Sequence, residues 1–311
     1  MKDKESALKK VGRWWTQSPE KLQQRPLIAW MEHDYIKKHI NRRTTGDESL
    51  DWFNYVLQKY FQASVERALS LGCGDGGLER HALTKGAVVT FDAYDASPGA
   101  IDGATQAAKD LGLLPQIHYA VADLNCFQAP AYPYGAVFAS MSIHHIQALE
   151  EVFDEIRKAL TPAGYFIMNE YIGPTRFQLP PIQEKVVNDL LNILPPRFRR
   201  IIRDGKVTSE IKSCHQVHPL SWFTENDPSE AVRSAEILPV LQRFFDLAEF
   251  KPYGGTLLQF LLENIVGNFD ESQEEAKAWL DMLAYVESAL EEAGAIESDF
   301  ALIVATPKKK M

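Results

Sequence analysis

A short apolar segment that runs into a glycine-rich turn constrains this chain more than any other feature. Residues 68–80 read A-L-S-L-G-C-G-D-G-G-L-E-R, which predicts a buried strand, a tight turn and the start of a helix. Glycine reaches positive φ without a Cβ clash and lets a ligand approach the backbone. Because the first turn of a helix directs backbone N–H groups at such a ligand, the segment predicts a nucleotide site.

Strands and helices alternate along the chain from this segment onward. Alternation of this kind is typical of a parallel sheet with helices on both faces, so we predict a doubly wound, mostly parallel seven-stranded α/β sheet. The expected strands are 68–71, 87–94, 116–121, 135–139, 165–169, 245–253 and 299–305, and the expected helices are 75–84, 99–111, 149–160, 256–266 and 271–293, with a turn at 161–164.

Other segments precede or interrupt the sheet. Aromatic residues at helical spacing, including Trp14, Trp15 and Leu27, predict helices before the first strand. Residues 174–240 fit no β-α-β unit and show helical stretches near 181–193 and 228–242. This segment and the helices at 256–293 both leave the sheet on the ligand side, so we expect them to form a lid over the site. The expected organisation is a helical cap at 1–66, a core at 67–173, a helical lid insertion at 174–240, and the end of the sheet at 241–311 with a helical insertion at 256–293.

A polar stretch, N-R-R-T-T-G-D-E at 41–48, lies just ahead of the core. It is too polar for a buried position and predicts a loop. One interpretation is that the loop reaches over the ligand, where Arg43 would pair with a carboxylate. The other is a solvated turn.

Acidic side chains follow two of the predicted strands. In a doubly wound sheet the ligand lies at the carboxyl ends of the strands. Asp95 follows the glycines by about 20 residues, the spacing at which a carboxylate accepts both hydroxyls of an adenosine ribose. Asp123 follows the next strand and is placed to accept a hydrogen bond from an adenine amino group.

Residues 67–170 resemble a class I S-adenosylmethionine (SAM)-dependent methyltransferase. The resemblance rests on L-G-C-G-D-G, Y-D-A-S-P-G-A-I, A-D-L-N, S-I-H-H-I and L-T-P-A-G-Y-F-I-M-N-E, one at each of the five strand ends. It implies SAM as the cofactor and an antiparallel last strand, with Gly72 and Gly74 facing the methionine part of SAM. The cofactor-binding residues it implies, with Arg43 added from the leading segment, are Arg43, Gly72, Cys73, Gly74, Asp95, Ala96, Asp123, Leu124 and Ser140.

Ser70 departs from the family pattern, because many members have an acidic residue two places before the first glycine. The usual contact to the SAM amino group is therefore in question. Arg43 or Thr45 from the leading segment are candidates to hold the amino acid end of the cofactor.

Two alternatives compete with this interpretation. Gly72, Gly74, Gly77 and Asp95 also satisfy the G-x-G-x-x-G pattern of an NAD-dependent dehydrogenase, but that pattern explains neither Asp123 nor S-I-H-H-I. A SAM-fold protein that has lost catalysis and acts as a binding partner fits the same residues.

Composition and charge limit the class of substrate and the cellular compartment that we expect. A net charge of -9 argues against broad contact with a phosphate backbone, so nucleic acid is not the expected substrate. No apolar run approaches the roughly 20 residues of a membrane span, and Met1 is not followed by the apolar stretch of a signal peptide, which favours the cytoplasm.

The three cysteines have no paired spacing. Cys214, His215 and His218 are potential ligands in one loop, but we predict no metal.

The acceptor is expected to be a small molecule. Residues 140–143 read S-M-S-I and not the N-P-P-Y of amino-directed nucleic-acid and protein methyltransferases. We expect transfer to an oxygen of a natural product, sugar or lipid-like intermediate, with N- and C-methylation left open. The catalytic candidates are His144 and His145, of which we favour His144 as the base, and Glu170. The substrate-binding candidates are Tyr171, Arg176, Trp222 and Tyr253.

Overall fold

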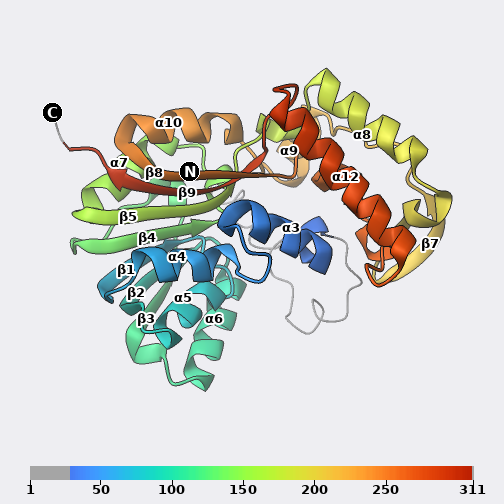
Figure 1. Ribbon diagram of the computed structural model, residues 1–311. Helices are drawn as coiled ribbons and strands as arrows, with labels where there is room; N and C mark the ends of the chain where they lie inside the picture. The colour runs from blue at the N-terminus through green and yellow to red at the C-terminus, as the bar shows by residue number, and fades with distance from the viewer. Residues whose placement is uncertain (1–28, 310–311) are drawn as a thin grey trace.

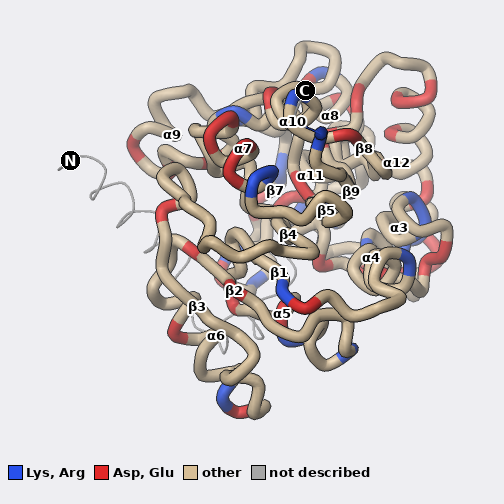
Figure 2. Tube along the Cα trace, turned by 90° about the vertical axis from the view of Figure 1, so that its left-hand side faces the viewer, with Lys and Arg blue, Asp and Glu red and all other residues tan. Residues whose placement is uncertain are grey.

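The central layer of the molecule is a seven-stranded sheet, and the computed structural model describes residues 29–309. β1 to β5 run parallel, whereas β9 lies antiparallel between β5 and β8, which confirms the predicted sheet and its antiparallel last strand. In spatial order, as Figure 2 shows, the strands are β3 (Ile117–Val121), β2 (Val88–Asp95), β1 (Val65–Leu71), β4 (Tyr134–Ser140), β5 (Leu160–Tyr171), β9 (Phe300–Pro307) and β8 (Phe245–Gly254).

Helices cover both faces of this sheet (Figure 1). α4 (Trp52–Tyr60), α5 (Gly77–Thr84) and α6 (Pro98–Asp110) pack on one face, and α7 (Leu149–Ala159) and α10 (Ile237–Phe244) pack on the other. The start of α6 follows the prediction, since the Ser97 hydroxyl accepts a hydrogen bond from the Ala100 N–H and Pro98 occupies the first turn.

The remaining elements form a helical cover beyond the carboxyl ends of β5 and β8, on the right of Figure 1. The helical cover consists of α3 (Asp34–Thr45), α8 (Pro181–Ile193), the hairpin β6 (Arg200–Arg203) and β7 (Lys206–Ile211), α9 (Leu220–Asn226), α11 (Leu258–Leu262) and α12 (Glu274–Glu292). Buried residues of α3, α8, α11 and α12 form one apolar cluster that also includes Tyr171 and Tyr253 at the strand ends.

Short 3-10 helices connect these elements. They are η1 (Trp30–Glu32), η2 (Leu114–Gln116), η3 (Leu124–Cys126), η4 (Ile143–His145), η5 (Thr175–Phe177), η6 (Pro196–Arg199), η7 (Ser234–Glu236) and η8 (Val266–Asn268). Across residues 29–309, no helix is both long enough and apolar enough to cross a membrane.

Four local predictions were wrong. The stretch 41–48 is not one loop, because α3 continues to Thr45 and ends at Gly46, whose φ of 84° gives a left-handed cap. Residues 200–211, expected in a helical lid insertion, form the β6–β7 hairpin around Asp204 and Gly205. The helix expected from 228 starts only at Ile237, and the turn expected at 161–164 is part of β5. The predicted helices containing Trp14, Trp15 and Leu27 lie outside the described residues.

A buried carboxylate joins α12 to the end of β8. Glu287 is fully buried and accepts hydrogen bonds from the N–H groups of Gly255, Leu257 and Leu258, at 2.7–3.0 Å. These bonds satisfy donors that the start of α11 leaves without intrahelical partners. A Cβ on Gly254 would lie 2.2 Å from Glu287 Oε1, so only glycine allows this approach. Glu287 thus fixes the helical cover to the sheet edge.

Candidate active site

The glycine turn after β1 lies directly against the turn after β4. Gly72 has a φ of 74° and its N–H donates to Tyr94 O at 2.7 Å. A Cβ on Gly72 would lie 2.3 Å from Ser142 Cβ, and the Ser142 hydroxyl donates to Leu71 O at 2.8 Å. Glycine at position 72 therefore lets the two strand ends approach each other.

A cavity of about 350 Å³ opens beside this turn. It includes four of the predicted cofactor residues, Gly72, Cys73, Gly74 and Ser140. Gly74 has a φ of 54°, and a Cβ there would meet no atom within 4 Å, so its backbone faces open space. The other lining residues are Trp52, Phe53, Ser70, Asp75, Gly77, Leu78 and Glu79.

Two predicted acidic residues lie near the glycine turn after β1. Asp95 accepts hydrogen bonds from the N–H groups of Gly74 at 2.9 Å and Ser97 at 2.8 Å. Asp123 accepts from the Asn125 N–H at 2.9 Å and so begins η3. A carboxylate has about four lone-pair sites, so both groups retain acceptor capacity for a ligand. Ala96 and Leu124 follow these two residues in the chain.

Arg43 does not belong to the lining of the cavity. Its guanidinium pairs with Glu291 of α12 at 2.6 Å and donates to Pro252 O at 3.4 Å. The carboxylate that Arg43 meets in this structure therefore comes from the chain itself. Thr45 bonds to backbone oxygens of its own helix and loop, including Asn41 O at 2.8 Å.

Glu170 is fully buried at the end of β5 and holds the turn after β4 in place. Its carboxylate accepts from the N–H groups of Ser142 at 2.9 Å and Ile143 at 2.7 Å. It also accepts from Nδ1–H of His144. Burial opposes charging of His144, but the negative charges of Glu170, Glu230 and Asp227 outweigh it and raise the pKa of this histidine.

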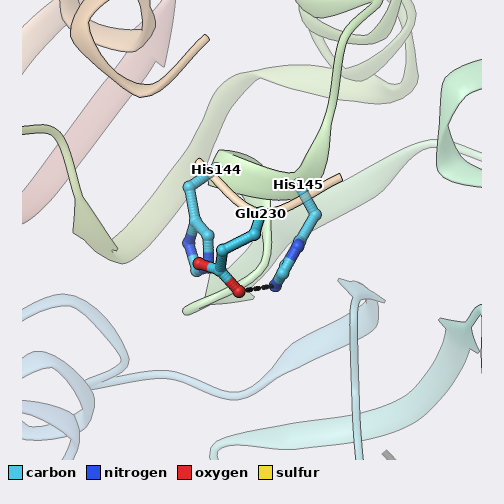
Figure 3. A group of neighbouring side chains, drawn as sticks. All are labelled: His144, His145 and Glu230. Carbon is cyan, nitrogen blue, oxygen red and sulfur yellow. Dashed lines mark ion pairs between the residues drawn. The ribbon is translucent and has the colours of Figure 1, made fainter. Parts of the chain in front are cut away.

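Glu230, which the sequence analysis did not identify, lies against both histidines (Figure 3). Its carboxylate oxygens lie 3.7 Å from Nε2 of His144 and 4.0 Å from Nε2 of His145. Burial raises the pKa of Glu230, although the charge of His144 opposes that shift. The insertion that carries Glu230 gives no motif and no fixed spacing to the strand ends, so its position depends on the tertiary fold.

His145 differs from His144 in its hydrogen bonds and in its charge. Its Nδ1 bonds to the Ser229 hydroxyl at 3.1 Å, and that hydroxyl donates to Asp227 at 2.8 Å. The Ser229 oxygen therefore accepts from Nδ1–H of His145. Burial, followed by the charge of His144, holds the pKa of His145 well below its usual value. The pKa of His145 is thus lowered where that of His144 is raised.

Ligand atoms of His144, His145 and Glu230 lie within 4.8 Å of one another, which is the spacing of a group that could hold a cation. Each histidine has its Nδ1 held by a hydrogen bond. Cys214, His215 and His218 form no such group in the described part of the chain, where His218 instead stacks on Trp222 at 4.3 Å between ring centroids.

A second cavity, of about 700 Å³, lies within the helical cover. Trp222 lines it, as do Phe177, Phe223 and Phe260, and Glu230 contributes to its wall. Glu230 therefore belongs both to the histidine cluster and to this cavity.

The other predicted substrate residues lie away from the cavity surface. Arg176 donates to Glu230 O at 2.7 Å and Pro228 O at 2.6 Å, and so fixes the segment that carries Glu230. Tyr171 and Tyr253 are each 1% exposed. The Tyr171 hydroxyl donates to Pro174 O at 3.0 Å, and the Tyr253 hydroxyl donates to Asn169 Oδ1 at 2.8 Å.

Comparisons with known proteins agree with the fold. Residues 68–164 match the methyltransferase domain family. The chain is 26% identical over 116 residues to the biotin biosynthesis bifunctional protein BioHC of Teredinibacter turnerae; the match covers 36% of this chain and spans only 20% of that protein.

A solved structure gives the same result for the fold. A geranyl diphosphate methyltransferase in complex with GPP and sinefungin superposes with a TM-score of 0.54 at 12% identity, covering 97% of this chain and 99% of the other. A S-adenosylmethionine dependent methyltransferase from Mesorhizobium loti superposes with a TM-score of 0.46 at 16% identity, covering 81% and 96%.

The residues present fit SAM. Gly74 offers exposed backbone beside the cavity, and Asp95 lies at its edge with acceptor capacity left. A buried carboxylate oxygen of Glu79, which lines the same cavity, has no hydrogen-bond partner among residues 29–309. Residues 68–164 therefore match a methyltransferase domain, and the residues around the cavity fit S-adenosylmethionine as its cofactor.

Proposed function

We propose that this protein transfers the methyl group of SAM to a small-molecule acceptor, with an oxygen of a natural product, sugar or lipid-like intermediate as the nucleophile. The observation that carries the proposal is the contact between Gly72 and Ser142. It brings the cofactor turn against the turn that holds His144 and His145, so a methyl donor and candidate bases share one strand-end site.

Residues at the ends of four strands would each hold a part of the cofactor. Gly72, Cys73, Gly74 and Ser140 line the cavity for the methionine part. Asp95 would accept the ribose hydroxyls, with Ala96 beside it. Asp123 would accept the adenine amino group, next to the buried Leu124. When bound, SAM supplies a methyl group on a sulfonium, which leaves by in-line displacement and needs the acceptor held in line.

The proton of the acceptor has two candidate bases. His144 is the first, because Glu170 fixes its Nδ1 and directs its Nε2 toward Glu230 and the second cavity. His145 is the second, because its low pKa keeps it neutral. Glu170 is a positioning residue in this scheme, since its hydrogen bonds go to the turn and to His144. A positioned base contributes about 10²–10⁴-fold to such a step.

The second cavity supports a small and partly apolar acceptor. Its volume of about 700 Å³ and its aromatic lining suit a compact, partly apolar molecule. The described geranyl diphosphate methyltransferase structure contains GPP, which is consistent with a lipid-like acceptor here. A net charge of -9 disfavours nucleic acid. Of the predicted substrate residues, Trp222 lines the cavity; Arg176 acts by fixing the Glu230 segment.

Transfer of label from methyl-labelled SAM tests the function. The purified protein is incubated with fractions of metabolite extracts, and labelled products are separated and identified. We expect one class of small product that carries a methyl on oxygen. Tight SAM binding without turnover across all fractions would instead favour the catalytically inactive binding protein.

A further inference from the structure

The serine that departs from the family pattern is bonded to a carboxylate that reaches the same cavity from a different element. Ser70 lies in β1 and is 3% exposed. Its hydroxyl donates to Glu79 Oε1, and Glu79 comes from the first turn of α5. Both residues line the cavity beside Gly72 and Gly74. A carboxylate is therefore present at this end of the cavity, although β1 does not supply it.

Glu79 lacks the partners that a buried carboxylate requires. The residue is 1% exposed, and its second oxygen, Oε2, has no hydrogen-bond partner in the described part of the chain. A buried charged group without full pairing is strongly unfavourable. A buried polar atom without a partner in the chain calls for one from outside it, such as a water molecule, an ion or a ligand.

The groups around Glu79 do not supply a cation in contact with it. Arg80 acts on it only at a distance, Asp75 repels it, and Ser70 donates the one side-chain hydrogen bond. Cys73 and Tyr119 also face Glu79, and its negative charge raises the pKa of each, after burial as the larger cause. The missing partner is thus a donor of positive charge that enters through the cavity.

We propose that Glu79, held by Ser70, binds the α-ammonium group of the methionine part of the cofactor. The inference rests on the proposed function. In the proposed function Asp95, which accepts the Gly74 N–H, would take the ribose hydroxyls. The amino acid end of the cofactor would then occupy the cavity beside Gly72 and Gly74, whose lining includes Glu79. The carboxylate reaches this position from α5, and Ser70 orients it from β1.

The contact couples cofactor affinity to pH. Burial raises the pKa of Glu79 to about 7, while its bond from Ser70 opposes the shift. An ammonium group binds the ionised carboxylate, so affinity is highest above this pKa and falls as the pH drops through it. Asp75 and Arg80 act on Glu79 in opposite directions, and neither touches the cavity oxygen.

Two ligands separate this contact from the rest of the site. S-adenosylhomocysteine carries the α-amino group, and 5′-methylthioadenosine has the same adenosine and sulfur without the amino acid. Their affinities are measured by calorimetry on wild type, Glu79→Gln and Glu151→Gln, a control at an exposed position of α7. We expect Glu79→Gln to weaken S-adenosylhomocysteine by about tenfold or more, the effect of a lost charge-assisted hydrogen bond, and to leave 5′-methylthioadenosine unchanged.

Each other outcome has one meaning. Equal effects of Glu79→Gln on both ligands, including no effect on either, overturn the assignment of Glu79 while wild-type binding still supports the proposed function. Wild type that binds neither ligand overturns both. If Glu79→Gln does not fold, Ser70→Ala replaces it and is judged by the same comparison: selective weakening of S-adenosylhomocysteine supports the assignment, and equal behaviour of the two ligands removes it.

Discussion

Ser142 and Gly72 approach so closely that a single added carbon on Gly72 would lie 2.3 Å from Ser142 Cβ. The two residues lie in the turns that follow β4 and β1, which are neighbours in the sheet. Through Ser142, the cofactor turn is connected to Glu170 and the histidines, because the same Ser142 N–H donates to Glu170. Displacement of the cofactor turn would therefore also displace the candidate bases.

Gly72→Ala tests this connection against a matched control. Gly86 has nearly the same φ, 69° against 74°, but a Cβ there meets no atom within 4 Å. A left-handed alanine costs about 1–2 kcal/mol, so Gly86→Ala should lower the free energy of unfolding by that amount and leave cofactor affinity unchanged. Gly72→Ala should lower it further and abolish S-adenosylhomocysteine binding, as measured by urea unfolding and calorimetry. Equal behaviour of the two variants would show that the contact is unimportant.

Asp95→Ala should weaken binding of S-adenosylhomocysteine by roughly 1.5–3 kcal/mol, the range for hydrogen bonds to a charged group. The variant also loses the acceptor for the Gly74 N–H, so the glycine turn becomes less ordered. Calorimetry measures the affinity, and Asp102→Ala, at an exposed position of α6, is the control. Unchanged affinity in Asp95→Ala contradicts the ribose contact.

Removal of metal should leave turnover unchanged. His144 pairs with Glu170 and lies 3.7 Å from Glu230, so these carboxylates already have a partner in the chain, and displacement at a sulfonium carbon needs no Lewis acid. The rate is measured before and after dialysis against EDTA. A loss that one divalent cation restores, together with loss of that response in Glu230→Gln, would assign His144, His145 and Glu230 to a metal site.

Glu287→Ala should strongly destabilise the protein. It leaves the N–H groups of Gly255, Leu257 and Leu258 buried without an acceptor, at about 1–3 kcal/mol for each. We expect the free energy of unfolding to fall by roughly 3 kcal/mol or more on that basis. Urea unfolding measures this, with Glu292→Ala, at an exposed position one turn further along α12, as the control. A difference below about 1 kcal/mol between the two variants contradicts the role of Glu287.

The sheet could be predicted from sequence because its signals are local. Apolar runs such as 135–139 and glycines such as Gly72 define strands and turns within a few residues, and alternation with helices fixes their parallel arrangement. The same logic placed Asp95, Ser140 and Glu170 at strand ends, where the structure has them.

The helical cover and its contribution to the site could not be predicted in this way. Glu230 meets His144 only after more than 80 residues of insertion have folded, and Arg43 meets Glu291 across nearly the whole chain. Tyr171 and Tyr253 were predicted to bind substrate but are buried. The sequence alone does not distinguish an aromatic residue at a strand end that faces a ligand from one that packs in the core. The family motif expects the carboxylate in β1, where this chain has Ser70. Glu79, which comes from α5, was therefore not identified from the sequence.

The pH dependence of turnover should distinguish the two candidate bases. Attraction by Glu170 and Glu230 raises the pKa of His144 despite its burial, whereas burial and the charge of His144 lower the pKa of His145. A base acts in its neutral form. If His144 is the base, the rate at saturating SAM should rise with pH above about 6.5, the ordinary histidine value, and Glu170→Gln should shift that rise to lower pH. If His145 is the base, the rate at saturating SAM should not change with pH in that range.

His144→Ala and His145→Ala complete the test. Loss of the true base should lower turnover about a hundredfold or more, while affinity for S-adenosylhomocysteine stays intact. Stability gives an independent readout: a raised folded pKa means that the charge of His144 stabilises the protein fully below the unfolded pKa, and this contribution disappears as pH rises through the folded pKa. His144→Ala should therefore lose most stability at acidic pH. If both histidine variants keep near-normal rates from pH 6 to 9, on the order of the range in which a histidine titrates, positioning alone carries the reaction.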